Sequence, residues 1–440
     1  MLFIIPAIAI MLIALLNYKT GFLLYLLFQM IWFPDAQVFQ IGDSWVNINL
    51  ICAVFFVLLY RLKKGRFSSK TTPFPYTNPM IAIAISLLMT CITSYSGVIS
   101  ELVKGIGLIF IDLLVIYVMW NTLNSRKDYA FLYKGLTVIM LFACIYIFYE
   151  KVTGQNPILD YKLTTTTSNL FTYREDSIYE NRGYRCYSIF DHTISACMTF
   201  ALYIALTANL YIKNKRYPFK TLSLITSFLC IPAMFFTKQR AGMFFLIIAL
   251  LSIVDFRKKR FWKLIGIAAL SIACAWPFIS NYLALFLSIF NSSYQGQVVG
   301  STSSMRFKQL YAVFKIMQMA PITGLGENFQ RYYHGMYAAQ ALGYESLWFE
   351  QMAKHGILGV LAYVYLIYYS VYKVPKRYHS KQVLFISLAY WITYTLTSTP
   401  YFRTYFLYGV LFYFMKNTPE LNLTEAAENN HYNKIRLRFR

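Results

Sequence analysis

Two cations interrupt one of the most apolar stretches of the sequence. Lys238 and Arg240, in the segment TKQRAG, lie inside an almost continuous apolar run from Leu222 to Val254. A charge at the centre of a bilayer usually costs about 2.5 to 3.5 kcal/mol, so intramembrane charges are treated first as functional. Other arginines lie next to predicted ends of apolar runs: Arg182, Arg185, Arg306 and Arg403.

Arginine has the chemistry to bind a phosphate group. Its planar guanidinium donates two parallel hydrogen bonds to phosphate oxygens, so several arginines around one cavity would suit a diphosphate at the membrane surface. For any single arginine, pairing with lipid phosphates or extension of the side chain to the interface is an equally good interpretation. The tight turn that holds Lys238 and Arg240 favours the functional interpretation for these two cations.

The composition predicts the elements that must position these cations. Of the 440 residues, 58% are hydrophobic and 13% are charged, which is far more apolar than a soluble domain. The net charge of +23 comes mostly from short basic clusters between apolar runs, a pattern typical of membrane topology and not of nucleic-acid binding. The sequence therefore predicts an all-α polytopic integral membrane protein, with residues 1–440 as a single membrane domain.

Apolar length predicts the membrane helices. A helix needs about 20 apolar residues to cross the hydrocarbon, and on that criterion the chain has about 12 to 13 candidate spans. They centre on residues 2–16, 21–34, 46–61, 79–95, 103–121, 129–149, 187–211, 221–236, 242–255, 264–290, 357–373, 383–398 and 404–416. The first two are short and could instead pair as a re-entrant hairpin.

The basic clusters predict the orientation. They occur in alternate connections, at residues 61–66, 126–127, 213–216, 257–260 and 373–377. By the positive-inside rule these connections are cytoplasmic, as is the basic tail at 417–440. The other connections then face outward, and two of them are long: a first outer loop at 150–186 and a second at 291–356.

The second outer loop has helical patterning of its own. After Ser303, a plausible N-cap, helical spacing places four apolar side chains on one face, and Pro321 follows the predicted end: Phe307, Leu310, Phe314 and Met317. A second amphipathic segment, YESLWFEQMAKHG, leads from Tyr344 toward the next span. Such helices on the outer surface suggest a lid or a substrate-facing domain.

Four motifs in this half of the chain resemble those of the O-antigen ligase and polymerase superfamily. TKQRAGMFF resembles its Ser-Arg-Gly segment, and RFKQLYAVFKIMQMAPITGLGENF resembles its outer-loop run of Arg, amphipathic helix, Pro and Gly-x-Gly. YESLWFEQMAKHGILGVLAYVYL is similar to the segment that closes that loop, and NRGYRCYSIFDHTISA to the entry of the span after the first long loop. The resemblance covers roughly residues 180–373 and implies a GT-C-like fold in which Arg185, Arg240 and Arg306 contact a polyprenyl-linked pyrophosphate.

Glu345 is the candidate for catalysis. Ligases of this superfamily usually have a histidine at the position eleven residues before the Gly that opens the next span, and counted back from Gly356 this position is Glu345. The difference resembles the polymerases, many of which have an acidic residue there. A carboxylate in a partly dry site can accept the proton that an attacking sugar hydroxyl loses. Alternatively, Glu345 favours the first turn of a helix, where a negative charge suits the helix dipole.

Other polar residues give weaker indications of a functional role. Asp191 and His192, at the head of a span, either bind sugar hydroxyls or cap the helix. Trp348 and the pair Tyr332 and Tyr333 could stack on sugar rings. Three charged residues of one span are expected to form an internal ion pair: Glu101, Lys104 and Asp112. The predicted catalytic residues are thus Glu345, Arg240 and Arg306, and the predicted substrate-binding residues are Arg182, Arg185, Lys238, His192, Asp191, Arg403 and Trp348.

These features predict a polymerase for O-antigen, capsule or exopolysaccharide in the bacterial cytoplasmic (inner) membrane. It would transfer a growing glycan from undecaprenyl diphosphate to a second lipid-linked repeat unit, with its active site facing the outside or periplasm. No metal or nucleotide-binding motif is present, so we expect a metal-independent glycosyltransferase without cofactors. Direct displacement by one acceptor would invert the anomeric centre.

Two other functions fit parts of the pattern. A ligase that joins finished polymer to a lipid or wall acceptor would use the same donor. A flippase or other transporter for lipid-linked oligosaccharides would do no chemistry, but the second outer loop has no counterpart in the first half of the chain, as paired transporter halves would require. Expected partners are undecaprenyl diphosphate-linked oligosaccharide, membrane lipids, a chain-length regulator and a flippase, with no nucleic acid.

Overall fold

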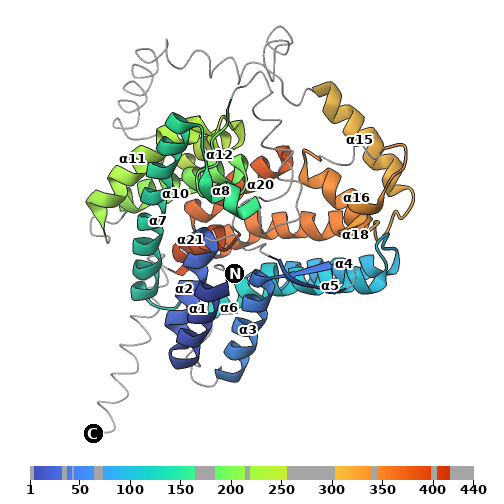
Figure 1. Ribbon diagram of the computed structural model, residues 1–440, viewed down its shortest axis with the longest axis horizontal. Helices are drawn as coiled ribbons and strands as arrows, with labels where there is room; N and C mark the ends of the chain where they lie inside the picture. Colours follow the sequence, from blue (N-terminus) through green and yellow to red (C-terminus); the bar gives the residue numbers. More distant parts are fainter. Residues whose placement is uncertain are drawn as a thin grey trace.

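The computed structural model describes residues 4–31, 37–41, 44–63, 73–163, 184–213, 219–254, 303–337, 344–397 and 404–416. Most of these residues are helical (Figure 1). The first half contains α1 (Ile4–Leu16), α2 (Tyr18–Ile31), β1 (Gln37–Ile41), β2 (Ser44–Asn47), α3 (Ile48–Lys63), α4 (Thr77–Met89), η2 (Thr90–Ile92), α5 (Val98–Leu108), η3 (Ile109–Leu114), α6 (Val115–Thr122), α7 (Arg126–Thr153) and α8 (Pro157–Leu163). The second half contains α10 (Thr193–Lys213), α11 (Lys220–Phe236), α12 (Arg240–Leu250), η4 (Leu251–Ile253), α15 (Ser303–Met317), α16 (Phe329–Tyr332), α18 (Leu347–Tyr368), η6 (Tyr369–Lys373), α19 (Val374–Arg377), α20 (Lys381–Leu396) and α21 (Thr404–Lys416).

The helices follow the predicted spans. Each predicted span that falls in the described residues coincides with a helix, while the predicted span at 264–290 lies outside them. Four helical segments in the described part are long and apolar enough to cross a membrane: Val98–Thr122, Arg126–Thr153, Thr193–Ile212 and Leu347–Arg377. The structure thus agrees with a helical membrane protein, and the number of spans stays a prediction.

Two local features differ from the prediction. A two-stranded antiparallel sheet, β1 with β2, lies between α2 and α3 in a chain predicted to be all-α. Its segments QVFQI and SWVN are too short for a helix of several turns and contain β-branched and aromatic residues, which favour strands. The span predicted from residue 187 begins as a helix only at Thr193, because residues 188–192 form turns and bends.

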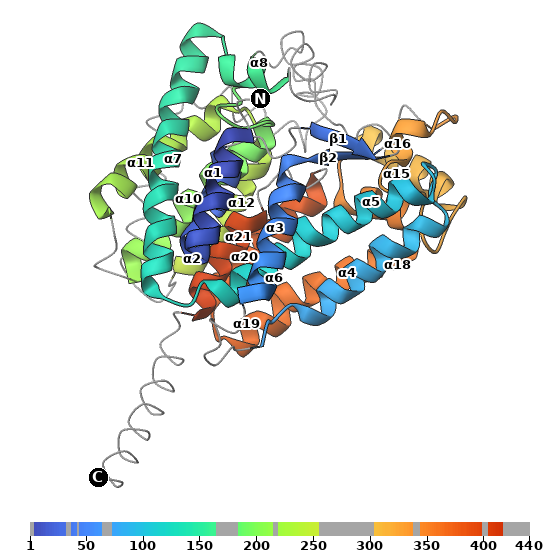
Figure 2. The same cartoon turned by 60° about the horizontal axis from the view of Figure 1, so that its bottom comes forward.

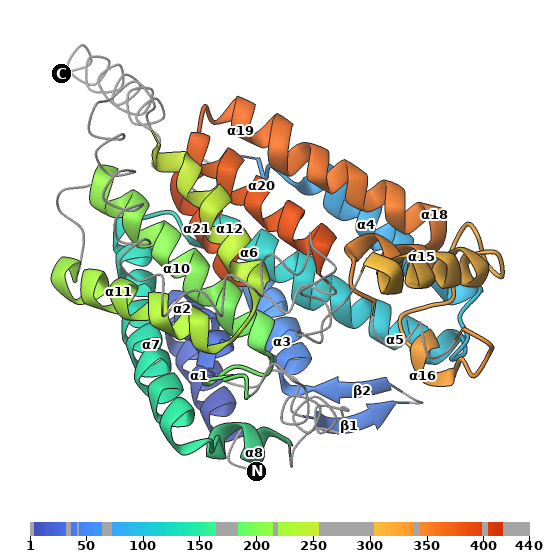
Figure 3. The same cartoon turned by 90° about the horizontal axis from the view of Figure 1, so that it is seen from above.

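The helices pack in two neighbouring groups. In one group α10 lies against α11 and α12, and α12 in turn packs on α20 (Figure 3). Of the most apolar stretch of α10, 89% is buried, as expected for a helix with apolar residues on every side. In the other group α4 runs beside α18, with α5 next to α4 (Figure 2), and α15 packs on α18. The candidate site lies where residues from both groups meet.

A break in α18 explains the Pro and Gly-x-Gly run. At Gly356 the backbone leaves the helical region, with φ 59° and ψ −150°. The N–H groups of the next two residues therefore cannot bond to the carbonyls one helical turn before them, as they would in a regular helix. The segment from Pro321 to Gly326 fills the gap. Ile357 and Leu358 donate to the carbonyls of Pro321 and Ile322, at 2.9 and 3.1 Å. Conversely, Leu325 and Gly326 donate to the carbonyls of Ala353 and Lys354, both at 3.0 Å.

Gly356→Ala is expected to destabilise the protein because a side chain is disfavoured at this backbone conformation. Strain of this kind costs about 1 to 3 kcal/mol. The added Cβ would also lie 2.6 Å from the carbonyl oxygen of Pro321. The matched control is Gly409→Ala in α21, whose Cβ would meet nothing closer than Met119 at 3.7 Å and which should keep or raise stability. Thermal unfolding of both variants in detergent tests this, and equal melting temperatures would contradict it.

Candidate functional site

The TKQRAG turn is held by its own backbone and by a side chain. After α11 ends, the N–H groups of Thr237 and Lys238 donate to the carbonyls of Met234 and Phe235, at 3.3 and 3.0 Å. Lys238 adopts the left-handed conformation at φ 51°, which is uncommon for a residue with a side chain. Gln239 Nε2 donates to Thr193 Oγ1 at 2.7 Å, so the turn is tied to the start of α10.

Gly242 brings this turn close to α10. A Cβ at Gly242 would lie 2.4 Å from Cys197 Sγ and 2.8 Å from the Cys197 backbone carbonyl, so only glycine allows α12 and α10 to approach this closely. Arg240 is the first residue of α12. A helix N-terminus carries partial positive charge and free N–H groups, which disfavours a cation there and attracts an anion. The site therefore has a second reason to bind a negatively charged ligand.

A buried carboxylate positions Arg185. Glu150, near the end of α7, accepts hydrogen bonds from the Tyr184 hydroxyl at 2.9 Å and from the backbone N–H groups of Tyr187 and Ser188. The backbone N–H of Cys186 donates to the Phe236 carbonyl at 3.1 Å, beside the TKQRAG turn. These contacts hold the segment around Arg185 from both sides. Glu150 was not among the residues singled out from the sequence, because a carboxylate at a helix end gives no indication of its distant partners.

The structure brings four of the predicted site residues together. The charged groups that act on the Arg240 guanidinium are Arg306, Glu345 and Arg185. Arg185 also lies close enough to Lys238 to affect its charge. Burial, together with the positive charges of Lys151 and Arg185, lowers the pKa of the Lys238 ammonium below its usual value. Cations thus outnumber Glu345 in this cluster, and an anionic ligand would reduce their mutual repulsion.

Arg306 and Glu345 face each other on the second outer loop. Arg306 Nε lies 3.6 Å from Glu345 Oε2, and its Nη2 donates to the Leu396 carbonyl at the end of α20, at 3.1 Å. The two side chains are 36% and 31% exposed. Ion pairs this exposed contribute only about 0 to 1 kcal/mol, so stability gives little reason for the pair. Both side chains remain accessible to a ligand.

Glu345 lies just before α18. Ser346 is the N-cap, and its Oγ accepts from the backbone N–H of Trp348 at 3.3 Å. Glu345 is therefore not part of the first helical turn, because it precedes the N-cap, and Ser346 already caps the helix. Trp348 itself is half-buried on the first turn of α18.

His192 caps α10. Its Nδ1 accepts a hydrogen bond from the backbone N–H of Ile194 at 3.1 Å. Burial lowers the pKa of the His192 imidazole to about 4, although the neighbouring Asp191 opposes this shift and Arg185 adds to it. The ring is therefore neutral at pH 7 and able to accept. Of the two alternatives for this pair, the structure supports helix capping for His192.

His192→Asn is expected to keep both stability and activity, because the asparagine Oδ1 can accept the same hydrogen bond, whereas His192→Leu should lose about 1 kcal/mol. Since folding lowers the pKa of His192, its contribution to stability is complete above about pH 6.5 and falls as the pH drops toward 4. Thermal unfolding between pH 4 and 7 measures both effects. Equal loss of stability in the two variants would contradict the capping role, and a His192→Asn protein that kept its stability but lost polymer formation would indicate a chemical role for the ring.

Several predicted residues are placed elsewhere. Arg182 and Arg403 lie outside the described residues, as does the side chain of Tyr332. Tyr333 is only 8% exposed and packs against Phe329 and Tyr95, so the proposed stacking of Tyr333 on sugar rings is wrong.

The ion pair expected among Glu101, Lys104 and Asp112 is also wrong for Glu101. Its carboxylate instead accepts from the backbone N–H of Glu327 at 2.6 Å and from the hydroxyls of Ser94 and Ser96. The two serines are close in the sequence, whereas Glu327 comes from a distant loop, and together they satisfy the carboxylate in place of Lys104.

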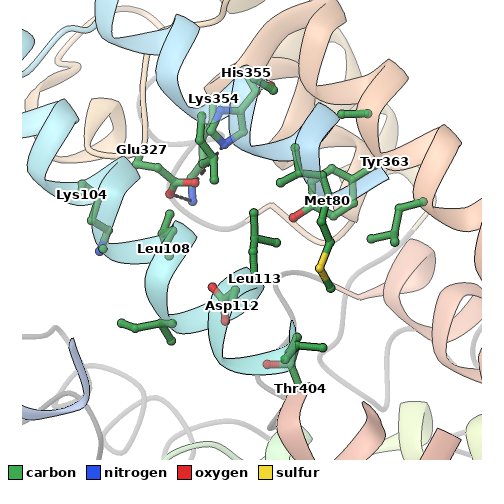
Figure 4. Close-up of a pocket in the computed structure, with 18 of the residues that line it drawn as sticks. Met80, Lys104, Leu108, Asp112, Leu113, Glu327, Lys354, His355, Tyr363 and Thr404 are labelled. Carbon is green, nitrogen blue, oxygen red and sulfur yellow. Dashed lines mark hydrogen bonds and ion pairs between the residues drawn. The ribbon is translucent and has the colours of Figure 1, made fainter. Parts of the chain in front are cut away.

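The sequence analysis missed a buried charged network behind the Gly-x-Gly run. Glu327 contacts Lys354 Nζ at 3.0 Å and His355 Nε2 at 2.9 Å, and Lys354 also pairs with Glu350 (Figure 4). Burial by itself raises the pKa of the Glu327 carboxyl, but the Lys354 charge and the His355 hydrogen bond outweigh it and hold that pKa well below its usual value. The spacing of Glu350 and Lys354, four residues apart in a helix, was the available signal.

Comparison with known proteins agrees with the motifs. Residues 225–364 match the family model described as O-antigen ligase. The matched segment contains Arg240, Arg306, Glu345 and the broken helix at Gly356. No curated protein matches the chain. Within the described ranges, no group of three or more His, Cys, Asp or Glu side chains is placed to hold a metal ion. Residues 225–364 therefore carry the signature of the O-antigen ligase and polymerase superfamily, as their motifs predicted.

Proposed function

We propose that this protein is a polysaccharide polymerase that transfers a growing glycan from undecaprenyl diphosphate to another lipid-linked repeat unit. The observation that carries the proposal is that Arg185 and the facing pair Arg306 and Glu345 lie within electrostatic range of Arg240, although these residues come from three separate connections. Such a cluster combines groups that bind a diphosphate with one carboxylate that can accept a proton. The family match supports the coarser role, a glycosyltransferase-like enzyme that acts on lipid-linked oligosaccharides.

The proposed reaction is one displacement. A hydroxyl oxygen of the acceptor sugar forms a bond to the anomeric carbon of the donor glycan, and the bond from that carbon to the diphosphate oxygen breaks. The bonding electron pair leaves with the undecaprenyl diphosphate, and Glu345 takes the proton of the attacking hydroxyl. Arg185, Arg240 and Arg306 stabilise the negative charge that grows on the leaving diphosphate. Attack from the face opposite the leaving group inverts the anomeric configuration.

One consideration supports a polymerase over a ligase, and another supports a site on the outer face of the cytoplasmic membrane over one on its inner face. Glu345 occupies the position where the ligases that the motifs resemble usually have histidine, so the proton acceptor differs in kind. The Lys238–Arg240 turn and parts of the two long outer loops contribute to one cluster, which is consistent with all three connections lying on one side of the bacterial cytoplasmic membrane.

The test uses purified protein and fluorescent lipid-linked repeat units in detergent micelles. A polymerase makes a ladder of longer lipid-linked glycans and releases one undecaprenyl diphosphate for each linkage formed. Transfer only to an added lipid or wall acceptor, with no ladder, would mean that the protein is a ligase. If no glycan moved to either acceptor while labelled lipid crossed proteoliposome membranes, a transporter would replace the enzyme.

A further inference from the structure

A cavity of about 470 Å³ lies beside the charged network (Figure 4). Its lining residues come from α2, α3, α4, α5 with η3 and α6, α18, α20 and α21, from β2, and from Glu327 after the Gly-x-Gly run. The volume falls in the range of about 300 to 1,000 Å³ that is typical of small-molecule sites. Aromatic side chains line it together with amides, including Trp45, Trp391 and Tyr394 with Asn47 and Gln351. This mixture of flat apolar surfaces and hydrogen-bonding groups suits a ligand that has apolar ring faces as well as hydroxyl groups.

Three buried polar atoms in residues that line the cavity have no hydrogen-bond partner in the described part of the chain. They are Ser86 Oγ, Gln351 Oε1 and His355 Nδ1, and their residues are only 4%, 4% and 3% exposed. A buried polar group left without a partner costs about 1 to 3 kcal/mol, and most such groups in native proteins have one. Three such atoms around one cavity indicate that a ligand supplies the missing hydrogen bonds.

The type of missing bond indicates a polyhydroxyl ligand. Gln351 Oε1 can only accept, and His355 Nδ1 accepts when Nε2 carries the proton toward the Glu327 carboxylate at 2.9 Å. In that tautomer both atoms need donors, while Ser86 Oγ can donate or accept. Sugar hydroxyls donate and accept, and the aromatic walls can cover the less polar faces of sugar rings.

The charges distinguish this cavity from the arginine cluster. Both acidic and basic side chains line it, including Asp112 and Glu350 with Lys104 and Lys354, and no described arginine does. Figure 4 shows Lys104 and Asp112 on the α5–η3 side and Glu327 with Lys354 on the other. A diphosphate would gain little here, because carboxylates would repel it. The two sites therefore suit different parts of a lipid-linked glycan.

Two of the helices that line the cavity, α18 and α20, also lead to the candidate catalytic pair, Glu345 and Arg306. Gln351 lies on the second turn of α18, six residues after Glu345, which directly precedes the N-cap Ser346. On α20, Tyr394 lies two residues before Leu396, whose carbonyl binds Arg306. A ligand in the cavity could thus present one hydroxyl to Glu345. We infer that this cavity binds the uncharged sugars of the acceptor repeat unit, an inference that rests on the proposed polymerase function.

The test compares matched buried residues. Gln351→Leu and Ser86→Ala change residues that line the cavity and remove polar atoms without a partner in the described part of the chain, so folding should be unaffected or improved. The control is Ser387→Ala, which removes from α20 a buried Oγ that likewise has no partner among the described residues, at a position that does not line the cavity. The probe is the free repeat-unit oligosaccharide released by mild acid from extracted lipid-linked repeats. Its binding to each purified protein is measured by equilibrium dialysis, with inorganic diphosphate as a second probe.

Gln351→Leu should weaken oligosaccharide binding about tenfold or more, and Ser86→Ala should weaken it less. Ser387→Ala should bind like the wild type, and diphosphate binding should be equal in all four proteins. If the wild type lengthens repeats while Gln351→Leu binds the oligosaccharide as tightly and elongates as fast, the cavity holds only water and the inference falls. A wild type that lengthens no repeats would overturn the proposed function first, and the acceptor assignment with it.

Discussion

Glu345→Gln is expected to reduce chain growth by about 100- to 10,000-fold, the usual effect of removing a general base. The amide keeps the size and shape of the side chain but cannot take the proton of the attacking hydroxyl. Folding should persist, because the side chain is 31% exposed and its pairing with Arg306 at 3.6 Å contributes little stability. The measurement is the rate at which purified protein lengthens fluorescent lipid-linked repeats, at matched protein level and with equal thermal unfolding.

Two further variants separate proton transfer from charge. Glu345→Asp retains a carboxylate with a shorter reach, so it should recover part of the activity lost in Glu345→Gln. Arg306→Gln removes the facing cation and should affect donor binding more than proton transfer. If Glu345→Gln elongated repeats at nearly the wild-type rate, Glu345 would only be a charge before the N-cap of α18, and the proton acceptor would have to be another group.

Arg240→Lys is expected to lose most donor binding although the charge is kept. An ammonium cannot reproduce the two parallel hydrogen bonds of a guanidinium, and a hydrogen bond to a charged group contributes about 1.5 to 3 kcal/mol, or about 10- to 150-fold in affinity. The effect is measured as binding of a labelled polyprenyl diphosphate and as polymer formation in membranes with equal amounts of each variant.

Lys238→Arg is the matched control in the same turn. Lys238 has the left-handed backbone conformation, and arginine and lysine are equally strained there, so this exchange changes only the head group. It should be tolerated better than Arg240→Lys. Full polymer formation and unchanged donor binding in Arg240→Lys would mean that the turn supplies only positive charge to the lipid surface, and that the diphosphate site lies elsewhere.

Local sequence was enough to predict the helices and the candidate site residues. Apolar length determines where a chain can form membrane helices, since every backbone group there must be paired within the segment. The break between the amphipathic segment and the following span was also readable, because Gly356 separates YESLWFEQMAKH from ILGVLAYVYL. Arg240, Arg306 and Glu345 could be selected because their motifs occur in a recognisable order; Arg306 and Glu345 lie near enough to Arg240 to affect its charge, and the roles of all three stay a prediction.

Only the tertiary structure decided which groups pair. Glu101 accepts from the backbone of Glu327, 226 residues later, and Glu150 binds the segment around Arg185 at the far end of the first long connection. Short-range patterns contain no information about such partners, because the pairing depends on how distant helices pack. The same applies to Tyr333, which packs on Phe329 of its own loop and on Tyr95 of another, and to the cavity, whose lining comes mostly from several helices and one strand. A charged or polar residue in the sequence thus shows that a partner is needed, and the packing determines whether that partner is the protein or a ligand.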